Sequence, residues 1–402
     1  MRIVTWSPCW PHDRFANGIA TYVASIREGL EAAGEQAVVM TGDLGEDVRD
    51  EAVFGLPEEP ADKPWAAALR IRLASRLSRN LGIQQTGGYR VGRAMRELDE
   101  QLSVDLLELE ESFGIASPLR REFRKPVVVR LHGPHFIVGP ATGVRRDREF
   151  WLRCAAEYQA IRRASAVSAP ARDVLDQVRR FYRLRLPNAR VIPNPAPSVA
   201  EADLWSADAC EPERILFVGR FDRVKGADVL LEAFTRLVER RPAARLVFVG
   251  PDVGLIRDGR SFRVEEYLEA FVPPAARERM EFTGNLPRER VASERRRAAL
   301  TVVSSRYETF SMTTLEAMAV GSPLIAPRTG GVVDLVEPER SGLLFDPEAP
   351  DELAAKMARL LEDRGAAARL GAQARRDAAR RFGREAVGER ARAFYADVLA
   401  GR

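Results

Sequence analysis

The sequence predicts an α/β protein of two domains. A chain of 402 residues is longer than one ordinary hydrophobic core accommodates, which indicates two domains of about 200 residues each. Short β-branched apolar runs alternate with amphipathic helical patterns along the chain. Three alternating prolines, Pro193, Pro195 and Pro197, together with residues 198–211, form the clearest linker. We therefore expect domains at 1–200 and 212–383, with a boundary near 200–212.

The composition is that of a soluble globular protein, with 46% hydrophobic and 30% charged residues. No apolar run reaches the length of a membrane span. The first residues enter a predicted strand directly and lack the apolar core of a signal peptide. The three cysteines, Cys9, Cys154 and Cys210, are widely scattered, which argues against a disulfide framework or a zinc site. We expect a protein of the reducing cytoplasm.

The first predicted strand covers residues 2–8, and a helix is predicted from Gly18 to Ala33. The loop between them lies at the carboxyl end of the strand, the edge where open α/β sheets bind ligands. A nicotinamide-binding domain would carry Gly-x-Gly-x-x-Gly here, and this loop has only Gly18. The pattern therefore disfavours an NAD-linked oxidoreductase. The second strand is predicted at 36–41.

A basic segment at 63–96 follows, in a chain whose net charge is only +4. It contains eight basic residues and no acidic one. After Trp65, the leucines Leu69, Leu73 and Leu77 recur every fourth residue, which predicts an amphipathic helix. Two interpretations stand: a surface helix that packs its leucines inward, or a helix that binds anionic lipid at a membrane surface. We favour the first, because any domain helix needs an apolar face.

Further strands are predicted at 105–109 and 126–131, and strands at 164–169 and 190–192 flank a helix at 172–182. All three histidines, His12, His132 and His135, lie in two loops at strand carboxyl ends. A neutral imidazole offers one donor and one acceptor to a hydroxyl or a phosphate. Because His132-Gly133 follows a Val-Val-Val strand directly, we favour a site role for His132.

The second domain opens with a buried strand that ends at Gly219, and a helix begins near Gly226. Arg220 and Lys225 lie in the loop between them. Two fixed cations on a strand–helix loop can neutralise the charge of a diphosphate, the arginine bidentately and the lysine as a point charge. Lys225 is informative because only four of the 62 basic residues are lysine.

A similar strand–loop–helix pattern occupies residues 299–321. The strand 299–303 leads to a polar loop, and Ser311 or Thr313 is a suitable cap for the helix that Gly321 ends. A helix N-terminus suits a phosphate, and the flanking carboxylates Glu308 and Glu316 can each accept from paired hydroxyls. A phosphate site flanked by two carboxylates that can each bind a diol matches the chemistry of a nucleotide sugar. The alternative is that these acids serve only the helix dipole.

The stretch at 308–319, Glu-Thr-Phe-Ser-Met-Thr-Thr-Leu-Glu-Ala-Met-Ala, resembles the donor-site signature of retaining glycosyltransferases of family 4, which have the GT-B fold. Ser311 and Met312 stand where this family often has glycine and leucine. Gly-Arg-x4-Lys-Gly at 219–226 is similar to the family's diphosphate-binding motif, and 280–287 to its turn beside the nucleobase. His132-Gly133 and 191–195 resemble its N-terminal motifs, and Pro195 replaces a glycine there.

The resemblance implies two Rossmann-like α/β/α domains facing across a cleft, the first binding the acceptor and the second the nucleotide sugar. Residues 384–402 would form a last helix that crosses back to the first domain. The catalytic residues would be Glu308, Arg220, Lys225 and His132, with His12 and His135 as weaker acceptor-side candidates. Donor contacts are implied for Gly18, Gly219, Asn285, Leu286, Phe310, Ser311, Met312, Thr313 and Glu316.

The implied enzyme is a metal-independent, hexosyltransferase-type glycosyltransferase that retains the donor's anomeric configuration. Its donor would be a UDP- or GDP-sugar, and its acceptor a hydroxyl of a glycan, lipid-linked or small molecule in bacterial polysaccharide or glycolipid biosynthesis. No cofactor and no nucleic acid are implied. The segment 63–96 adds peripheral contact with the inner face of the cell membrane as an open question. The alternatives are a GT-B nucleotide-sugar epimerase and a non-catalytic nucleotide-sugar-binding partner.

Overall fold

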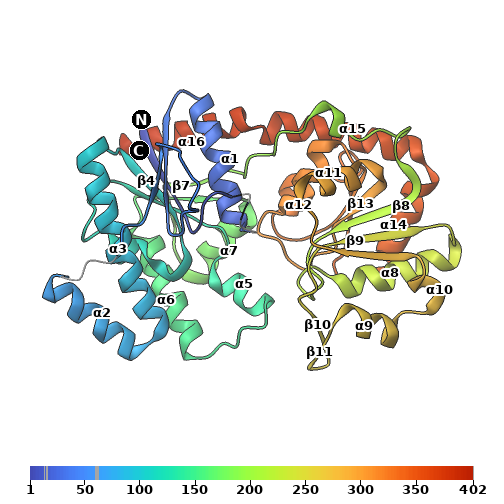
Figure 1. Cartoon of the computed structure of the whole chain (residues 1–402), viewed down its shortest axis with the longest axis horizontal. Helices are drawn as coiled ribbons and strands as arrows, with labels where there is room; N and C mark the ends of the chain where they lie inside the picture. The colour runs from blue at the N-terminus through green and yellow to red at the C-terminus, as the bar shows by residue number, and fades with distance from the viewer. Residues whose placement is uncertain (13, 15–16, 59–62, 402) are drawn as a thin grey trace. The chain divides into compact units, whose positions relative to one another are not determined.

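A computed structural model describes residues 1–12, 14, 17–58 and 63–401. It divides into two compact units: Met1–Pro195 with Arg384–Arg402, called unit 1, and Ala196–Gly383, called unit 2. Each unit is built around a parallel sheet with helices on both faces (Figure 1). The predicted α/β class with two parallel-sheet domains is confirmed.

The boundary between the units falls at Pro195, earlier than the expected 200–212. The reason is that the stretch after Pro195 is bonded to unit 2. The Ala196 amide donates to the Phe382 carbonyl over 2.7 Å, and the Trp205 indole N–H donates to the Ala298 carbonyl over 2.8 Å. Most of the proline-rich segment therefore packs on unit 2 and is not a free linker.

The sheet of unit 1 has the strand order β3-β2-β1-β4-β5-β6-β7, with every pairing parallel. Because β4 pairs on the opposite side of β1 from β2, the direction of strand succession reverses between β1 and β4. Six of these strands agree with the predicted positions within two residues, and β3 was not predicted. The bounds are β1 Arg2–Ser7, β2 Gln36–Thr41, β3 Val53–Gly55, β4 Leu106–Glu110, β5 Val127–Arg130, β6 Ala166–Ala169 and β7 Ala189–Val191.

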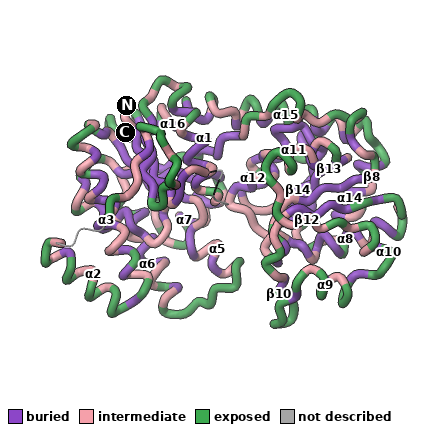
Figure 2. Tube along the Cα trace, in the orientation of Figure 1, coloured by how far each residue is buried: buried purple, intermediate pink, exposed green. Residues whose placement is uncertain are grey.

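Apart from the helix over 65–77, the long helices of unit 1 bury apolar residues against this sheet, whose central strands are buried (Figure 2). The helix over 172–182 is confirmed, and the first helix ends one residue earlier than predicted. The bounds are α1 Gly18–Ala32, α2 Trp65–Leu77, α3 Arg79–Leu102, η1 Ser112–Gly114, α4 Ala116–Leu119, α5 His135–Ala141, α6 Arg148–Arg163, α7 Arg172–Tyr182 and α16 Arg384–Leu399.

The last helix, α16, packs along α1 within unit 1 (Figure 1). Two glycines allow this close approach, since a Cβ atom on Gly388 would lie 2.0 Å from the Gly29 carbonyl oxygen. Further along α16, the buried Tyr395 hydroxyl donates to Glu108 on β4 over 3.0 Å. Glu108 also accepts from Tyr22 of α1 at 2.7 Å. A buried polar network therefore ties α16 and α1 to the centre of the sheet.

The helix α2 forms as predicted, but the inward packing of its leucines is wrong. Leu69, Leu73 and Leu77 are 46%, 50% and 58% exposed, and Trp65 is 79% exposed. Only Ala67 of this helix is buried, because α2 packs on α3 and not on the sheet. The larger apolar stripe, here called the α2 stripe (Trp65, Leu69, Leu73 and Leu77), faces solvent.

Unit 2 contains a parallel sheet of strand order β12-β9-β8-β13-β14-β15 and a hairpin of β10 and β11. Here the direction reverses between β8 and β13. Phenylalanines from β8, β9 and α8 fill the core beneath the sheet. The strands are β8 Glu211–Val218, β9 Arg245–Val249, β10 Leu255–Arg257, β11 Arg260–Phe262, β12 Met280–Gly284, β13 Ala298–Val302, β14 Leu324–Pro327 and β15 Leu343–Phe345. The helices are η2 Glu201–Asp203, α8 Ala227–Arg240, α9 Val264–Phe271, α10 Pro274–Arg277, α11 Arg288–Arg297, α12 Met312–Val320, α13 Val332–Leu335, α14 Pro350–Glu362 and α15 Arg364–Phe382.

Candidate active site

The carboxyl ends of β8 and β13 bring two predicted motifs together in unit 2. The strands are neighbours, with Val302 beside Phe217 in the register, so the loops that follow them start side by side. Strand-order reversal at this position opens a crevice where α/β sheets bind ligands. The first loop carries Arg220 and Lys225, and the second carries Glu308.

Hydrogen bonds hold the two loops against each other. The Ser304 hydroxyl donates to the carbonyl oxygens of Lys225 and Gly226 at 2.9 and 3.0 Å. Gly226 has φ +65°, and a Cβ atom there would lie 1.9 Å from the Ser304 carbonyl oxygen. Only glycine meets both conditions. Sterics therefore explain why the motif has glycine after lysine. Gly226 allows the two loops to touch, and this contact brings Lys225 within reach of Glu308.

Lys225 and Glu308 form the central ion pair, with 2.6 Å between Nζ and Oε1. The same oxygen accepts from the Ser305 hydroxyl at 2.6 Å. The backbone carbonyl of Glu308 accepts from the Gly331 amide at 2.8 Å, which fixes the loop from the side of β14. Both charged side chains are mostly covered, so the pair is preorganised and shielded from solvent.

Arg220 lies at the exposed rim of the same loop. Its Nε donates to Asp222 over 2.6 Å, and the other carboxylate oxygen of Asp222 accepts from the Lys225 amide at 2.7 Å. Asp222 therefore orients the Arg220 side chain and the Lys225 backbone together. Sequence reasoning did not assign this aspartate, although its place between the two cations was a usable signal.

The helix α12 begins where the Glu308 loop ends. Ser311 is its N-cap, as predicted for one of two candidates, and the Ser311 hydroxyl accepts from the Thr314 amide. Ser311 has φ +69°, a conformation that glycine adopts freely. This serine therefore keeps the backbone shape that a glycine would give. Phe310 is buried and packs edge-on near Phe382, so its side chain supports the loop from inside.

Glu316 lies one turn into α12 and pairs with the buried Arg295 of α11. About a third of its side chain is exposed, which leaves carboxylate surface for a ligand. Arg295 was not assigned from the sequence, because arginine is too frequent in this chain to mark one position. Met312 and Thr313 occupy the first turn of α12, between Glu308 and Glu316 in the chain.

Two further predicted donor contacts lie at other strand ends of the same sheet. Gly219 follows β8, and its amide donates to the Val249 carbonyl over 2.9 Å. Asn285 and Leu286 follow β12, after Gly284 with φ +68°. Asn285 is exposed and Leu286 half-buried. The order of the strands places all these groups along one edge of unit 2.

In unit 1, His132 lies after β5 in a loop that a buried carboxylate holds. Glu111 accepts from the His132 amide at 2.8 Å and from the Gly133 amide at 2.7 Å. The imidazole meets the Tyr22 ring edge-on at 4.9 Å. Burial, and then the charge of Arg130, lowers the pKa of His132 well below its usual value. The imidazole is therefore neutral near pH 7 and can both donate and accept.

Glu157 on α6 is a second buried carboxylate, and it holds the backbone of His135 as Glu111 holds that of His132. It accepts from the His135 amide at 2.8 Å and from Arg153 at 3.2 Å. Burial and the charge of Glu111 raise the pKa of Glu157 to about 8, while burial lowers the pKa of His135 to about 4. The His135 ring is buried beside Phe150. These buried carboxylates were missed, although the Glu-Leu-Glu-Glu run at 108–111 was visible in the sequence.

His12 and Gly18 both follow β1. The His12 ring lies 6.0 Å from the Trp10 ring, and Asn17 caps α1 at the first helical residue, Gly18. Among the described residues, no atom lies within 4 Å of a Cβ atom placed on Gly18. Roles for His12, Gly18, His132 and His135 toward ligands stay predictions.

Within the described ranges, no three His, Cys, Asp or Glu side chains gather as a metal site would require. No helix in the described part of the chain combines the length and apolarity that crossing a membrane demands.

Both units match known sequence families. Residues 17–195 match the glycosyl transferase 4-like domain, and residues 206–377 match glycosyl transferases group 1. Two parallel-sheet α/β units that match these two models in this order define a GT-B glycosyltransferase. The chain belongs to the family 4 type of these enzymes, as its motifs predicted.

Individual relatives are distant. A D-inositol 3-phosphate glycosyltransferase of Nocardiopsis dassonvillei is 29% identical over 63% of this chain, and the match spans only 61% of that relative. The uncharacterized glycosyltransferase MJ1607 of Methanocaldococcus jannaschii is 25% identical over 93% of this chain and 92% of its own length.

Solved structures agree on the fold. The sucrose-phosphate synthase tll1590 from Thermosynechococcus elongatus superposes with a TM-score of 0.73 at 23% identity, covering 100% of both chains. Anabaena Alr3699/HepE, solved in complex with UDP-glucose, gives a TM-score of 0.66 at 17% identity, again covering 100% of both chains. At these identities the likeness concerns the fold alone.

Proposed function

We propose that this glycosyltransferase moves a hexosyl group from a UDP- or GDP-sugar to an acceptor hydroxyl, with retention and without a metal. The observation that carries the proposal is the joining of Lys225 and Glu308 across the β8 and β13 loops, at 2.6 Å. It sets a cation and an anion side by side at the edge where such sheets bind ligands. The UDP-glucose complex of the structurally similar Anabaena protein supports a UDP-sugar as the first donor to test.

In this mechanism, unit 2 holds the donor and unit 1 the acceptor. Lys225 and Arg220 stabilise the leaving diphosphate, together with the α12 N-terminus around Ser311. Glu308 accepts from the donor sugar hydroxyls, and Glu316 accepts from the ribose. The bond between the anomeric carbon and the diphosphate breaks as the acceptor oxygen bonds to the same face. The acceptor proton passes to the departing phosphate oxygen. His132, neutral at pH 7, contacts the sugar from unit 1.

The test is a panel of UDP-, GDP- and ADP-sugars, followed by thermal shift and by release of nucleoside diphosphate, with Lys225→Ala and Lys356→Ala compared. Lys356 lies on the outer helix α14 and pairs with Glu352, so it is a matched control. Binding of one donor that only Lys225→Ala abolishes supports the site. No response to any nucleotide sugar would refute the proposal.

The product separates the proposal from its alternatives. Proton NMR of the glycoside shows whether the anomeric configuration is retained, and turnover in EDTA tests metal independence. A free epimerised sugar formed without an acceptor would indicate an epimerase. Tight donor binding without any turnover across an acceptor panel would indicate a non-catalytic partner.

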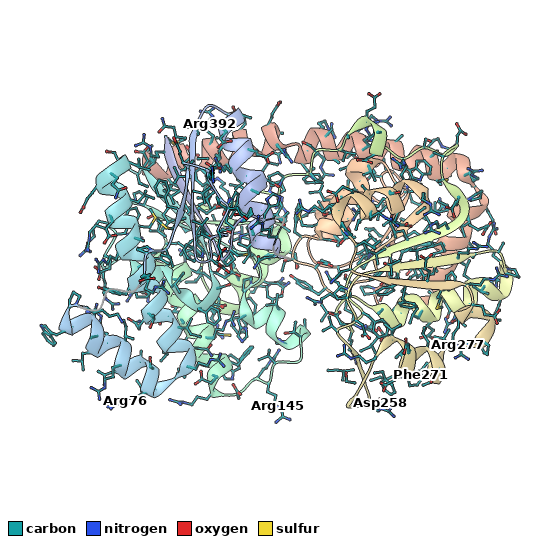
Figure 3. All side chains as sticks on the ribbon, in the orientation of Figure 1. Arg76, Arg145, Asp258, Phe271, Arg277 and Arg392 are labelled. Atoms are coloured by element: carbon teal, nitrogen blue, oxygen red, sulfur yellow. The ribbon has the colours of Figure 1, made fainter. Side chains whose placement is uncertain are left out.

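We also propose that unit 1 contacts the inner face of the cell membrane through the α2 stripe, which fits a lipid-linked acceptor in polysaccharide or glycolipid biosynthesis. Arg72 and Arg76 flank the exposed leucines, and Arg76 extends from α2 into solvent (Figure 3). Exposed apolar side chains beside arginines bind anionic lipid surfaces. Vesicle co-sedimentation tests this: wild type should bind anionic vesicles at low salt, and Leu69→Glu/Leu73→Glu should not. Equal binding of both proteins would refute the contact.

A further inference from the structure

Unit 1 contains a pocket of about 690 Å³ beneath the corner where α2 meets α3. This volume falls within the range of about 300–1,000 Å³ that small-molecule sites occupy. Its walls come from both sides of the strand-order reversal, with Trp6 at the end of β1 and Glu110 at the end of β4. The α3 residues Ile83 and Arg90 form the facing wall. The pocket therefore lies at the edge of unit 1 where ligands are expected.

Two buried polar atoms of this pocket lack partners in the described part of the chain, although the side chains that carry them are bonded through other atoms: Arg90 donates through Nη2 to the Pro57 carbonyl over 3.4 Å, and Trp6 hydrogen-bonds to Glu110. Within the described residues, neither Glu110 Oε2 nor Arg90 Nε has a hydrogen-bond partner, although both atoms are buried. A buried polar atom without a partner carries a free-energy cost that a ligand can remove. Burial, and then the charge of Glu111, raises the pKa of Glu110 to about 7. Near neutral pH, its carboxyl group can thus donate to a ligand hydroxyl as well as accept from one.

The pocket has a positive rim and an apolar approach. Arg79 lies at the exposed rim, and Arg90 contributes a second guanidinium. Ser75 and Arg79 line the pocket, and the exposed Leu77 of the α2 stripe stands between them in the chain. The last residue of the stripe is therefore close to the rim in the chain, and the exposed Ile83 lines the pocket as well.

The corner itself is fixed. Ser78 caps α3, and its hydroxyl donates to Glu149 of α6 over 2.7 Å. Asn80 donates to the same carboxylate at 3.0 Å. The rim and the stripe are thus held in one position relative to the pocket floor.

We propose that this pocket binds the head of an anionic amphiphile, as the acceptor site of the proposed glycosyltransferase. A phosphate contacts Arg79 and Arg90, an acceptor hydroxyl contacts Glu110, and the apolar part lies along Ile83 and the α2 stripe. The class of ligand follows from the two guanidiniums, the unpartnered Glu110 Oε2 and the exposed leucines of α2. That the ligand is the acceptor of the reaction rests on the proposed function. That the pocket binds an anionic amphiphile rests on the pocket alone.

Isothermal titration with dihexanoyl phosphatidic acid, glycerol 3-phosphate and inorganic phosphate tests the proposal. The lipid should bind at least about tenfold more tightly than glycerol 3-phosphate, because its chains bury methylene groups. Arg90→Gln should weaken lipid binding by about tenfold or more. Ile83→Glu should weaken lipid binding by a similar factor. Because Ile83 is partly exposed, a charged side chain there should not prevent folding. Arg96→Gln, on the same helix but paired with Glu122, is the control and should leave binding unchanged.

Equal affinities for the lipid and inorganic phosphate would overturn the amphiphile and indicate a free phosphate site. Arg90→Gln and Arg96→Gln losing lipid affinity equally would overturn the pocket as the binding site. The same holds if the α2 variant Arg72→Gln/Arg76→Gln loses as much lipid affinity as Arg90→Gln. UDP titrated into the same samples reports on unit 2 separately. Absent lipid binding with intact UDP binding therefore overturns this inference and leaves the donor site standing.

Discussion

The Lys225 ammonium lies 2.6 Å from a carboxylate oxygen of Glu308, and this ion pair joins the loop after β8 to the loop after β13. The two residues are far apart in sequence and meet because their strands are neighbours in the sheet. Each side chain holds the other in place before a donor arrives. Preorganised charges of this kind contribute more to catalysis than mobile ones, because no reorganisation is needed during the reaction.

Glu308→Gln should lower turnover by about 10²-fold or more, because the group that pairs with Lys225 and is proposed to hold the donor sugar loses its charge. UDP affinity should stay within a fewfold of wild type, since Lys225 and Arg220 remain. Initial rates and UDP titration measure the two effects. Glu337→Gln, which removes an exposed partner of Arg340, serves as control. A parallel loss of turnover and UDP affinity would instead assign Glu308 to loop structure.

Arg295→Met should destabilise unit 2 by about 1–3 kcal/mol, because it leaves Glu316 without its buried counter-charge. It should also raise the KM for the donor, since the carboxylate proposed to hold the ribose loses its orientation. Denaturant unfolding and donor saturation curves measure both. Arg359→Met, which breaks an exposed pair with Glu339, should do neither. A donor KM unchanged in Arg295→Met would speak against a ribose contact by Glu316.

Glu157 predicts a pH dependence of stability. Its pKa is about 8 in the folded protein and near 4.5 when unfolded. The folded state therefore binds more protons between these values, and the contribution of Glu157 is fully present below pH 4.5 and lost as the pH rises through 8. Glu157→Gln removes this titration.

The melting temperature of Glu157→Gln relative to wild type should therefore rise between pH 5 and pH 9. Thermal unfolding at several pH values measures the difference. A constant difference for Glu157→Gln over this range would contradict the elevated pKa.

Tyr395→Phe should destabilise unit 1 by about 1–3 kcal/mol, because it removes the buried hydroxyl that donates to Glu108 over 3.0 Å. The groups proposed to bind the diphosphate, Lys225, Arg220 and the α12 N-terminus, belong to unit 2, so UDP affinity should be unchanged. Chemical unfolding and UDP titration test the two statements. The neighbouring variant Phe394→Leu changes apolar packing only and reports what a conservative change in the same helix costs. Stability equal to wild type in Tyr395→Phe would mean that Glu108 does not depend on this bond.

Local sequence patterns determined much of the fold. The β-branched runs predicted the positions of most strands, and Ser311 and Gly321 bound the helix that begins beside Glu308. These features depend on neighbours a few residues away, so they can be read from the chain itself. The order of the motifs identified the family, because strand–loop–helix motifs each leave a local signature.

Tertiary structure alone decided which charges meet. Arg295 pairs with Glu316, Asp222 links Arg220 to Lys225, and Glu111 holds the His132 loop. These partners lie on different elements or fold back across a turn, and in a chain with so many arginines and acids no pattern selects them. The sequence pattern likewise did not predict that the α2 stripe faces solvent. A helical period shows that one face is apolar, but only the packing of α2 on α3 shows that Ala67 is buried and the leucines face solvent.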